Sequence, residues 1–200
     1  MSVVIAICGI YFCSFVADGR LVVGNNDQLT VISERVRKIY KINNHVLFSG
    51  TGWFQNDEEI TSPLDSFDNW EVITADMARN AVIEYIENHQ HLIRSPRNYL
   101  IGYKSDDGSF GIHEIHYDSD TRNIVAVERK PQLPTSSFAI SCCLPPKVSN
   151  RSQEYINKVT CCIKSSRMHD ELIQKVGAVI GEISQIDESV NSNVLVESLY

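Results

Sequence analysis

The stretch VADGRLVVGNN, residues 16–26, places an acidic residue, a glycine and an arginine in succession directly after an apolar run. Asp-Gly is a common hairpin tip, so a tight turn is the simplest interpretation. Upstream, residues 2–8 (SVVIAIC) and 10–17 (IYFCSFVA) are rich in β-branched and aromatic side chains. They predict two paired strands that meet at Gly9. A turn alone would explain Asp18-Gly19-Arg20, unless residues elsewhere in the chain are placed to work with it.

The remaining elements are grouped by type along the chain. Residues 35–42 and 45–50 predict further strands, and apolar residues four apart predict a helix over 70–90, with a capping box from Asp68 to Glu71. Four strands follow at 98–104, 109–117, 123–129 and 137–142, then two helices and a last strand within 190–200. Grouped strands and grouped helices favour an α+β layered fold over alternating βαβ units.

Bulk composition narrows the class of protein. We expect 200 residues to form a single domain spanning 1–200, because one core can still grow at this length. The net charge of −7 and a pI near 5.3 argue against a nucleic-acid surface. No apolar run of 18 residues is present, so we expect no membrane span. The apolar N-terminus lacks a basic segment, which favours paired strands over a signal peptide.

The metal-binding residue types show no convergent pattern. None of the six cysteines forms a CxxC pair, and we expect buried, reduced thiols in a cytoplasmic protein. His113 and His116 resemble a metal motif, but residues three apart on a strand face opposite sides. The sequence therefore predicts neither a metal nor an organic cofactor.

A series of motifs in residues 2–50 resembles a known family. Ser2 lies sixteen residues before Asp18, in the turn Ala17-Asp18-Gly19-Arg20. Gly24 follows, then KIYKI at 38–42, and a predicted strand ends in Ser49-Gly50. This series resembles proteasome β-type subunits and the HslV-like peptidases, which are N-terminal nucleophile (Ntn) hydrolases. The resemblance covers most of the chain and implies a four-layer αββα sandwich.

The resemblance also implies an active site whose logic is simple. A serine hydroxyl needs a base, and a free α-amino group has a pKa of about 7.7–8.0, near working pH. If Met1 is removed, Ser2 carries its own base. Lys38 would lower the pKa of that amine by charge repulsion, Asp18 would hold Lys38, and the N–H of Gly50 would stabilise the oxyanion. Arg20 and Ser49 would support the surrounding backbone, Arg20 by tying the turn to nearby carbonyls or carboxylates.

The basic position beside Asp18 has two candidates. Lys38 requires four more residues after Gly24 than the family usually has, whereas Arg35 requires only one. Guanidinium keeps the charge, but its geometry differs from that of ammonium and it is never neutral. We favour Lys38 and retain Arg35 as the alternative.

Two parts of the family pattern are altered. Where the family has a Gly-Ser-Gly turn, the chain reads Ser141-Cys142-Cys143, so the supporting serine would be Cys142, or Ser141 after a one-residue slip. Near the C-terminus Asp187 fits a D-x-x-S-G-G turn, but Ser189 comes one residue early and the glycines are missing. Residues 54–69 also look like a shortened replacement of the family's first helix.

The resemblance therefore implies two functions of different classes. The first is a peptidase or amide hydrolase with Ser2 as nucleophile, acting on peptide or protein substrates within a homo-oligomeric ring, with an ATPase unfoldase as a further partner. The second is a catalytically inactive proteasome-like subunit that serves as a scaffold or binding protein. The lost serine and glycine positions favour the second, and the intact motifs around Ser2 and Asp18 favour the first.

Overall fold

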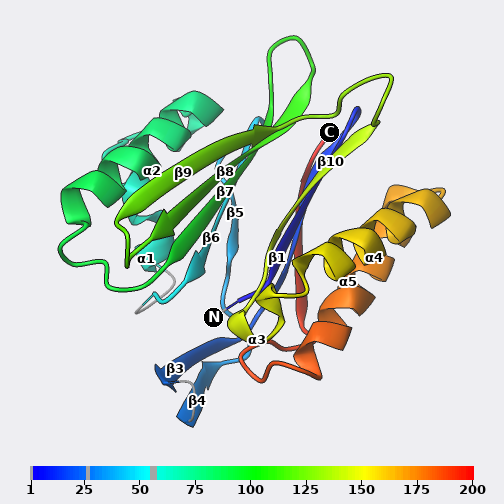
Figure 1. The fold of residues 1–200 in the computed structure, drawn as a ribbon. Coiled ribbons are helices and arrows are strands. Elements are labelled where there is room, and N and C mark those ends of the chain that lie inside the picture. Colours follow the sequence, from blue (N-terminus) through cyan, green and yellow to red (C-terminus); the bar gives the residue numbers. More distant parts are fainter. Residues whose placement is uncertain (1, 26–27, 55–57) are drawn as a thin grey trace.

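The computed structural model of the chain describes residues 2–25, 28–54 and 58–200. Two antiparallel sheets lie between two layers of helices (Figure 1). In the first sheet the strand order is β10 (Phe138–Cys143), β1 (Val4–Gly9), β2 (Cys13–Asp18) and β11 (Val194–Leu199). In the second it is β5 (Ile39–Lys41), β6 (Val46–Gly52), β7 (Arg97–Lys104), β8 (Phe110–Asp118) and β9 (Asn123–Arg129). The predicted αββα sandwich is confirmed.

The helices cover the outer faces of the two sheets. On the first sheet lie α4 (Ser152–Ser165) and α5 (His169–Ser184), preceded by the short α3 (Pro146–Ser149). On the second lie α2 (Ala75–His89) and the short α1 (Glu58–Thr61), with the 3₁₀ turns η1 (Ser62–Leu64) and η2 (Trp70–Val72) between them. The four-residue α1 agrees with the expectation that this part of the fold is reduced.

The alternation of side chains along β1 sends them into two different layers of the core. In and just before β1, Val3, Ile5 and Ile7 pack against α4 and α5, while Val4 and Ala6 face the second sheet. Both rows are fully buried, which explains why the sequence here is continuously apolar rather than alternating. Each large apolar side chain buried in this way contributes roughly 1.5–3 kcal/mol. The N-terminal strand is thus fixed in the middle of the molecule.

The helix predicted over 70–90 begins later and buries a different face. Thr74 is its N-cap, with Oγ1 accepting from the N–H of Met77. The predicted capping box is wrong, because Asn69, one residue after Asp68, accepts from Glu71 N and begins η2 instead. Met77 is exposed, and the buried row is Ala78, Val82 and Ile86. The sequence pattern indicates Ile73, Met77, Ala81 and Tyr85, of which Ala81 and Tyr85 are only partly buried against the core. A spacing of four fits both rows, so periodicity alone does not tell which of them is the more buried.

The segment after the Asp18 turn also differs from the prediction. β3 (Leu21–Asn25) and β4 (Gln28–Ser33) form a two-stranded ribbon apart from the main sheets (Figure 1), and β4 was not predicted. The strand predicted at 35–42 is reduced to β5, because Val36 N donates to Gly19 O at 2.7 Å. Residues 34–38 therefore cross the turn before the chain enters the second sheet.

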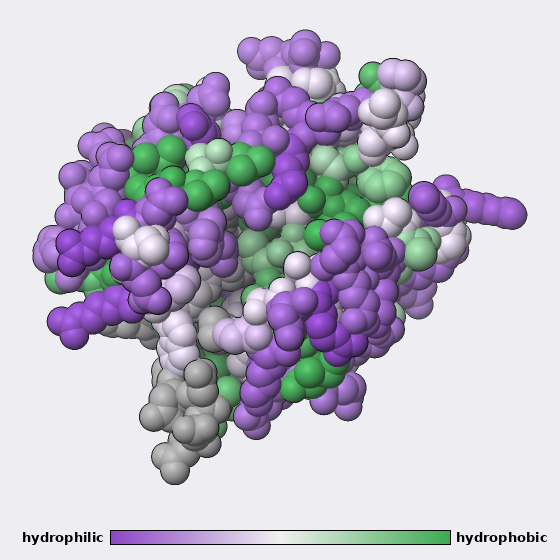
Figure 2. All heavy atoms as spheres, viewed as in Figure 1, coloured by the Kyte–Doolittle hydropathy of each residue, from purple (hydrophilic) through white to green (hydrophobic). Residues whose placement is uncertain are grey.

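The surface is mostly hydrophilic on the face shown in Figure 2, with hydrophobic side chains along β9 and between the two sheets. Val125 and Val127 of β9 are 45% and 41% exposed. Among the described residues, no helix has the length and apolar character needed to cross a bilayer.

Candidate functional site

Asp18 is a buried carboxylate at the end of β2. Its side chain has no exposed surface, and both of its oxygens accept hydrogen bonds. Val3 N donates to Oδ1 at 2.9 Å, while Arg20 N and Lys38 Nζ donate to Oδ2 at 2.9 Å each. Asp18 therefore joins the start of the chain, the turn and Lys38.

Lys38, and not Arg35, occupies the basic position beside Asp18. The Lys38 side chain is 2% exposed, and Nζ also donates to Arg20 O at 2.5 Å. Burial lowers the pKa of Lys38, and the charge of Asp18 opposes that shift. Arg35 is exposed, and its backbone N–H donates to Ser33 Oγ at 3.2 Å. Between Gly24 and Lys38 the chain forms most of the ribbon of β3 and β4.

Ser2 is half-buried and lines a cavity of about 460 Å³. Both backbone polar groups of the next residue bind Asp18: Val3 N donates to Asp18 Oδ1 at 2.9 Å, and Val3 O accepts from Asp18 N at 3.3 Å. Ser2 is therefore the neighbour, along the chain, of the residue whose N–H binds the buried carboxylate. Met1 lies outside the described residues, so its removal stays a prediction.

Gly50 follows Ser49 on β6, next to Lys38. The ladder of β5 and β6 begins with Ile39 opposite Ser49, and Lys38 and Gly50 are the chain neighbours of this pair on the same side. Ser49 Oγ donates to Lys38 O at 2.7 Å, which ties β6 to the lysine backbone. A Cβ on Gly50 would lie 3.0 Å from Ile60 Cγ2 and 3.1 Å from an atom of the Phe54 ring. Close packing against α1 therefore also requires a small residue here.

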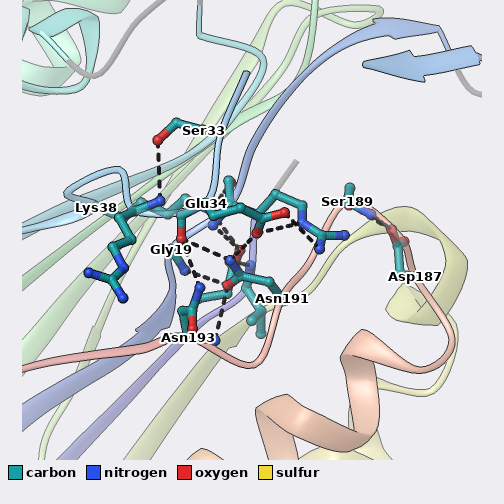
Figure 3. A network of polar contacts seen from close by, with 12 residues as sticks. Gly19, Ser33, Glu34, Lys38, Asp187, Ser189, Asn191 and Asn193 are labelled. Carbon is teal, nitrogen blue, oxygen red and sulfur yellow. Dashed lines mark hydrogen bonds and ion pairs between the residues drawn. The ribbon is translucent and has the colours of Figure 1, made fainter. Parts of the chain in front are cut away.

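The turn is fixed from outside by a polar network (Figure 3). Asn191 Oδ1 accepts from Gly19 N at 3.0 Å, and its Nδ2 donates to Glu34 O at 2.9 Å. Arg20 Nη1 donates to Glu188 O at 2.6 Å, and its Nε donates to a Glu34 oxygen at 3.1 Å. Arg20 thus contacts both a carbonyl and a carboxylate. Its hydrogen bond, followed by that of Asn191, lowers the pKa of Glu34.

Asp187 and Ser189 form a buried pair between α5 and β11. The N–H and the hydroxyl of Ser189 both donate to Asp187 Oδ1, at 2.9 and 2.6 Å. Their side chains are 3% and 4% exposed. Ser189 therefore contacts Asp187 from its position two residues along the chain, and Asn191 binds Gly19.

Cys142 lines the Ser2 cavity, and Ser141 does not. In the β1–β10 ladder, Ser141 lies opposite Ala6 and Cys142 opposite Ile5. Burial raises the pKa of Cys142 to about 12, with a smaller contribution from the charge of Glu114. The Cys142 thiol is therefore neutral at physiological pH and packs with the apolar residues under α4 and α5.

The other predicted features fall as follows. All six cysteines are free thiols, but the expectation that all would be buried holds only for Cys8, Cys13 and Cys143. Cys142 and Cys162 are partly buried, and Cys161 is exposed on the outer side of α4. His113 faces α2, near Asp76, whereas His116 faces the Ser2 cavity. In the described part of the chain, no group of three or more His, Cys, Asp and Glu side chains could hold a metal ion.

The fold has relatives among solved structures. HslV from Trypanosoma brucei matches with a TM-score of 0.58 and 12% identity, covering 98% of this chain and 98% of that one. The chain has the proteasome-like Ntn fold. Anbu (ancestral beta-subunit) from Yersinia bercovieri matches with a TM-score of 0.56 and 12% identity, and an Anbu Gly-1 mutant from Hyphomicrobium sp. strain MC1 with 0.55 and 8%. Both matches cover 98% of this chain and 80% of the Anbu chain. No protein-family model and no curated protein matches the sequence.

Sequence reasoning missed the residues that hold the Asp18 turn from outside. Glu34, Asn191 and Asn193 meet at the turn, where Asn193 Nδ2 donates to Glu34 O at 3.1 Å. Asparagine side chains often bind backbone groups in turns, but Asn191 and Asn193 lie within the segment 190–200, for which the sequence predicts a strand. Nothing in the pattern shows which backbone they bind, because that partner is more than 150 residues away.

Proposed function

We propose that the chain is a proteasome-like subunit that hydrolyses peptide or amide bonds, with Ser2 as its N-terminal nucleophile after removal of Met1. The observation that carries this proposal is the buried Asp18–Lys38 pair, held at 2.9 Å and bonded through Asp18 to the N–H of Val3. A buried ion pair is costly to form and contributes little net stability. Because Asp18 binds the N–H of the residue that follows Ser2, the ion pair is placed for a role at the N-terminus.

In the proposed mechanism the Ser2 hydroxyl attacks the carbonyl carbon, and the Ser2 amine takes the hydroxyl proton. Lys38 keeps that amine neutral through charge repulsion, and Asp18 positions Lys38. The N–H of Gly50 stabilises the negative charge on the carbonyl oxygen. The amine then returns its proton to the leaving group, and water hydrolyses the ester. No metal or organic cofactor takes part, and Arg20, Ser49, Cys142 and Asp187 are positioning residues.

We further propose a cytoplasmic, homo-oligomeric assembly that takes peptide or protein substrates and cooperates with an ATPase unfoldase. Closed symmetry is the usual form of such self-association. The free thiols support a reducing compartment.

The second candidate is an inactive subunit of the same fold that serves as a scaffold or binding protein. The specific observation in its favour is Cys142, whose neutral thiol stands at the proposed serine position and packs with apolar residues. A thiol is a weak hydrogen-bond donor and acceptor, so it would orient the Ser2 amine poorly.

A matched set of Ser2 variants tests the two candidates. Hydrolysis of a mixed fluorogenic peptide library should be lost in Ser2→Ala and retained in Ser2→Thr, which keeps the hydroxyl group. Lys38→Arg should lose most activity, because its guanidinium stays charged and cannot reproduce the ammonium geometry. Equal hydrolysis by the wild type and Ser2→Ala, or none by the wild type, would contradict the hydrolase and leave the scaffold.

A further inference from the structure

We propose that the cavity beside Ser2 binds the cationic side chain of a lysine or arginine residue. The inference rests on the proposed function, since it takes this cavity as the place where a substrate side chain sits. Its volume of about 460 Å³ falls in the range of ordinary ligand pockets and is ample for one long side chain.

The chemical character of the cavity comes from one face of the second sheet. On β7 and β8, Asn98 pairs with His116 and Leu100 pairs with Glu114. Leu100 belongs to the apolar layer between the sheets. Toward Ser2 the same face becomes polar, and Asn98, Glu114 and His116 line the cavity. Asn98 and Glu114 are partly buried there, and His116 is exposed.

Glu114 supplies a carboxylate with unused hydrogen-bonding capacity. Arg129 Nε donates to its Oε2 at 2.6 Å, from a side chain that is 43% exposed. Among the described residues, no donor is paired with Oε1. Glu114 is 23% exposed, so its charge is partly shielded from water. The charge reaches the cavity: after burial, Glu114 is the next contributor to the raised pKa of Cys142 and of Cys143, ahead of the opposing effect of Arg129.

His116 adds a second acceptor. Its Nδ1 lies 2.7 Å from Asn98 Oδ1, while Asn98 Nδ2 donates to Thr51 Oγ1 at 3.3 Å. With the amide oxygen of Asn98 toward the imidazole, we assign the ring proton to Nδ1 from this hydrogen-bond network. In the neutral ring, Nε2 is then left as an acceptor.

The lining residues, all within the described chain, include no lysine or arginine. The cavity therefore combines one carboxylate oxygen and one imidazole nitrogen, both acceptors, with no cation of its own. An ammonium or guanidinium group complements this set, because it has only donors and carries the opposite charge. A substrate carboxylate would meet the like charge of Glu114, with no lysine or arginine in the lining to offset it.

Binding can be measured apart from catalysis. Trp53 lines the cavity, so a Trp70→Phe background reports on it through a single tryptophan. The probes are the N-acetyl methylamides of lysine, norleucine and glutamate, which differ only in the side chain. We expect the lysine amide to bind at least ten-fold more tightly than norleucine, and glutamate to bind most weakly.

Two variants of one ion pair should act in opposite directions. Glu114→Gln should weaken binding of the lysine amide about ten-fold, the usual loss when a charged acceptor becomes neutral. Arg129→Gln should strengthen it, because the competing cation is removed. Glu128→Gln is the matched control: Glu128 contacts Tyr103 and Lys130, which do not line this cavity, and should leave binding unchanged.

The outcomes separate the site from the chemistry. Equal affinity for lysine and norleucine amides, an unchanged affinity in Glu114→Gln, or no Trp53 response to the lysine amide would overturn the inference. Lysine-selective binding together with no peptide hydrolysis would contradict the proposed hydrolase, while supporting the cation site.

Discussion

Replacing Asp18 by asparagine should strongly destabilise the folded chain. The change keeps the shape of the side chain but leaves the ammonium of Lys38 buried, at 2% exposure, without a counter-charge. Removing one member of a buried pair typically costs about 3–5 kcal/mol. The N–H groups of Val3 and Arg20 also lose a charged acceptor, and the new amide NH₂ faces donors. We therefore expect Asp18→Asn to lower the free energy of unfolding by about 3–5 kcal/mol.

A double variant distinguishes the charge effect from general disruption. Asp18→Asn combined with Lys38→Met should recover much of the loss, because a buried pair replaced by uncharged side chains is often near neutral in stability. The control is Glu188→Gln, which removes a pair with Lys147 whose side chains are 65% and 48% exposed. An exposed pair contributes about 0–1 kcal/mol.

Urea unfolding followed by circular dichroism, at pH 7 and one protein concentration, measures all four proteins. The reasoning is refuted if Asp18→Asn costs no more than Glu188→Gln, or if the double variant is no more stable than Asp18→Asn alone.

Three further predictions follow from the same contacts. Burial lowers the pKa of Lys38 from its usual 10.5, so between the lowered pKa and 10.5 the unfolded chain binds more protons than the folded chain. The free energy of unfolding should therefore rise with pH in that window, and a rise of the same size in Lys38→Met would contradict this. Asn191→Ala should lower the free energy of unfolding in urea by about 1–3 kcal/mol, because the buried N–H of Gly19 loses its acceptor. A decrease clearly below about 1 kcal/mol would argue against the contact. Iodoacetamide at pH 8 should modify the exposed Cys161 before Cys142, whose pKa is raised to about 12; peptide mapping that finds Cys142 first would exclude this order.

Local patterns predicted most of the elements, and the resemblance predicted the layers. The apolar rows of β1 and β2 and the regular strands β7 to β9 are encoded within a few residues each, so they could be predicted. The start of α2 could not be predicted in this way. Asp68 and Thr74 are both favourable N-cap residues, and the helix of the folded chain begins after Thr74.

The candidate site likewise has a part that the local sequence predicts and a part that depends on distant segments. The spacing from Ser2 to Asp18 is local, whereas the choice between Lys38 and Arg35 depended on a ribbon whose second strand was not predicted. The contacts of Asn191 with Gly19 and Glu34 join distant segments, and no spacing rule anticipates them.

The central claim is that Ser2 becomes an N-terminal nucleophile. Intact mass spectrometry of the natively expressed protein, before and after incubation with a β-lactone, tests it most directly. We predict a chain that lacks Met1 and gains one lactone adduct, which peptide mapping places on Ser2 and which is missing in Ser2→Ala. A chain that retains Met1 and gains no adduct would contradict the claim.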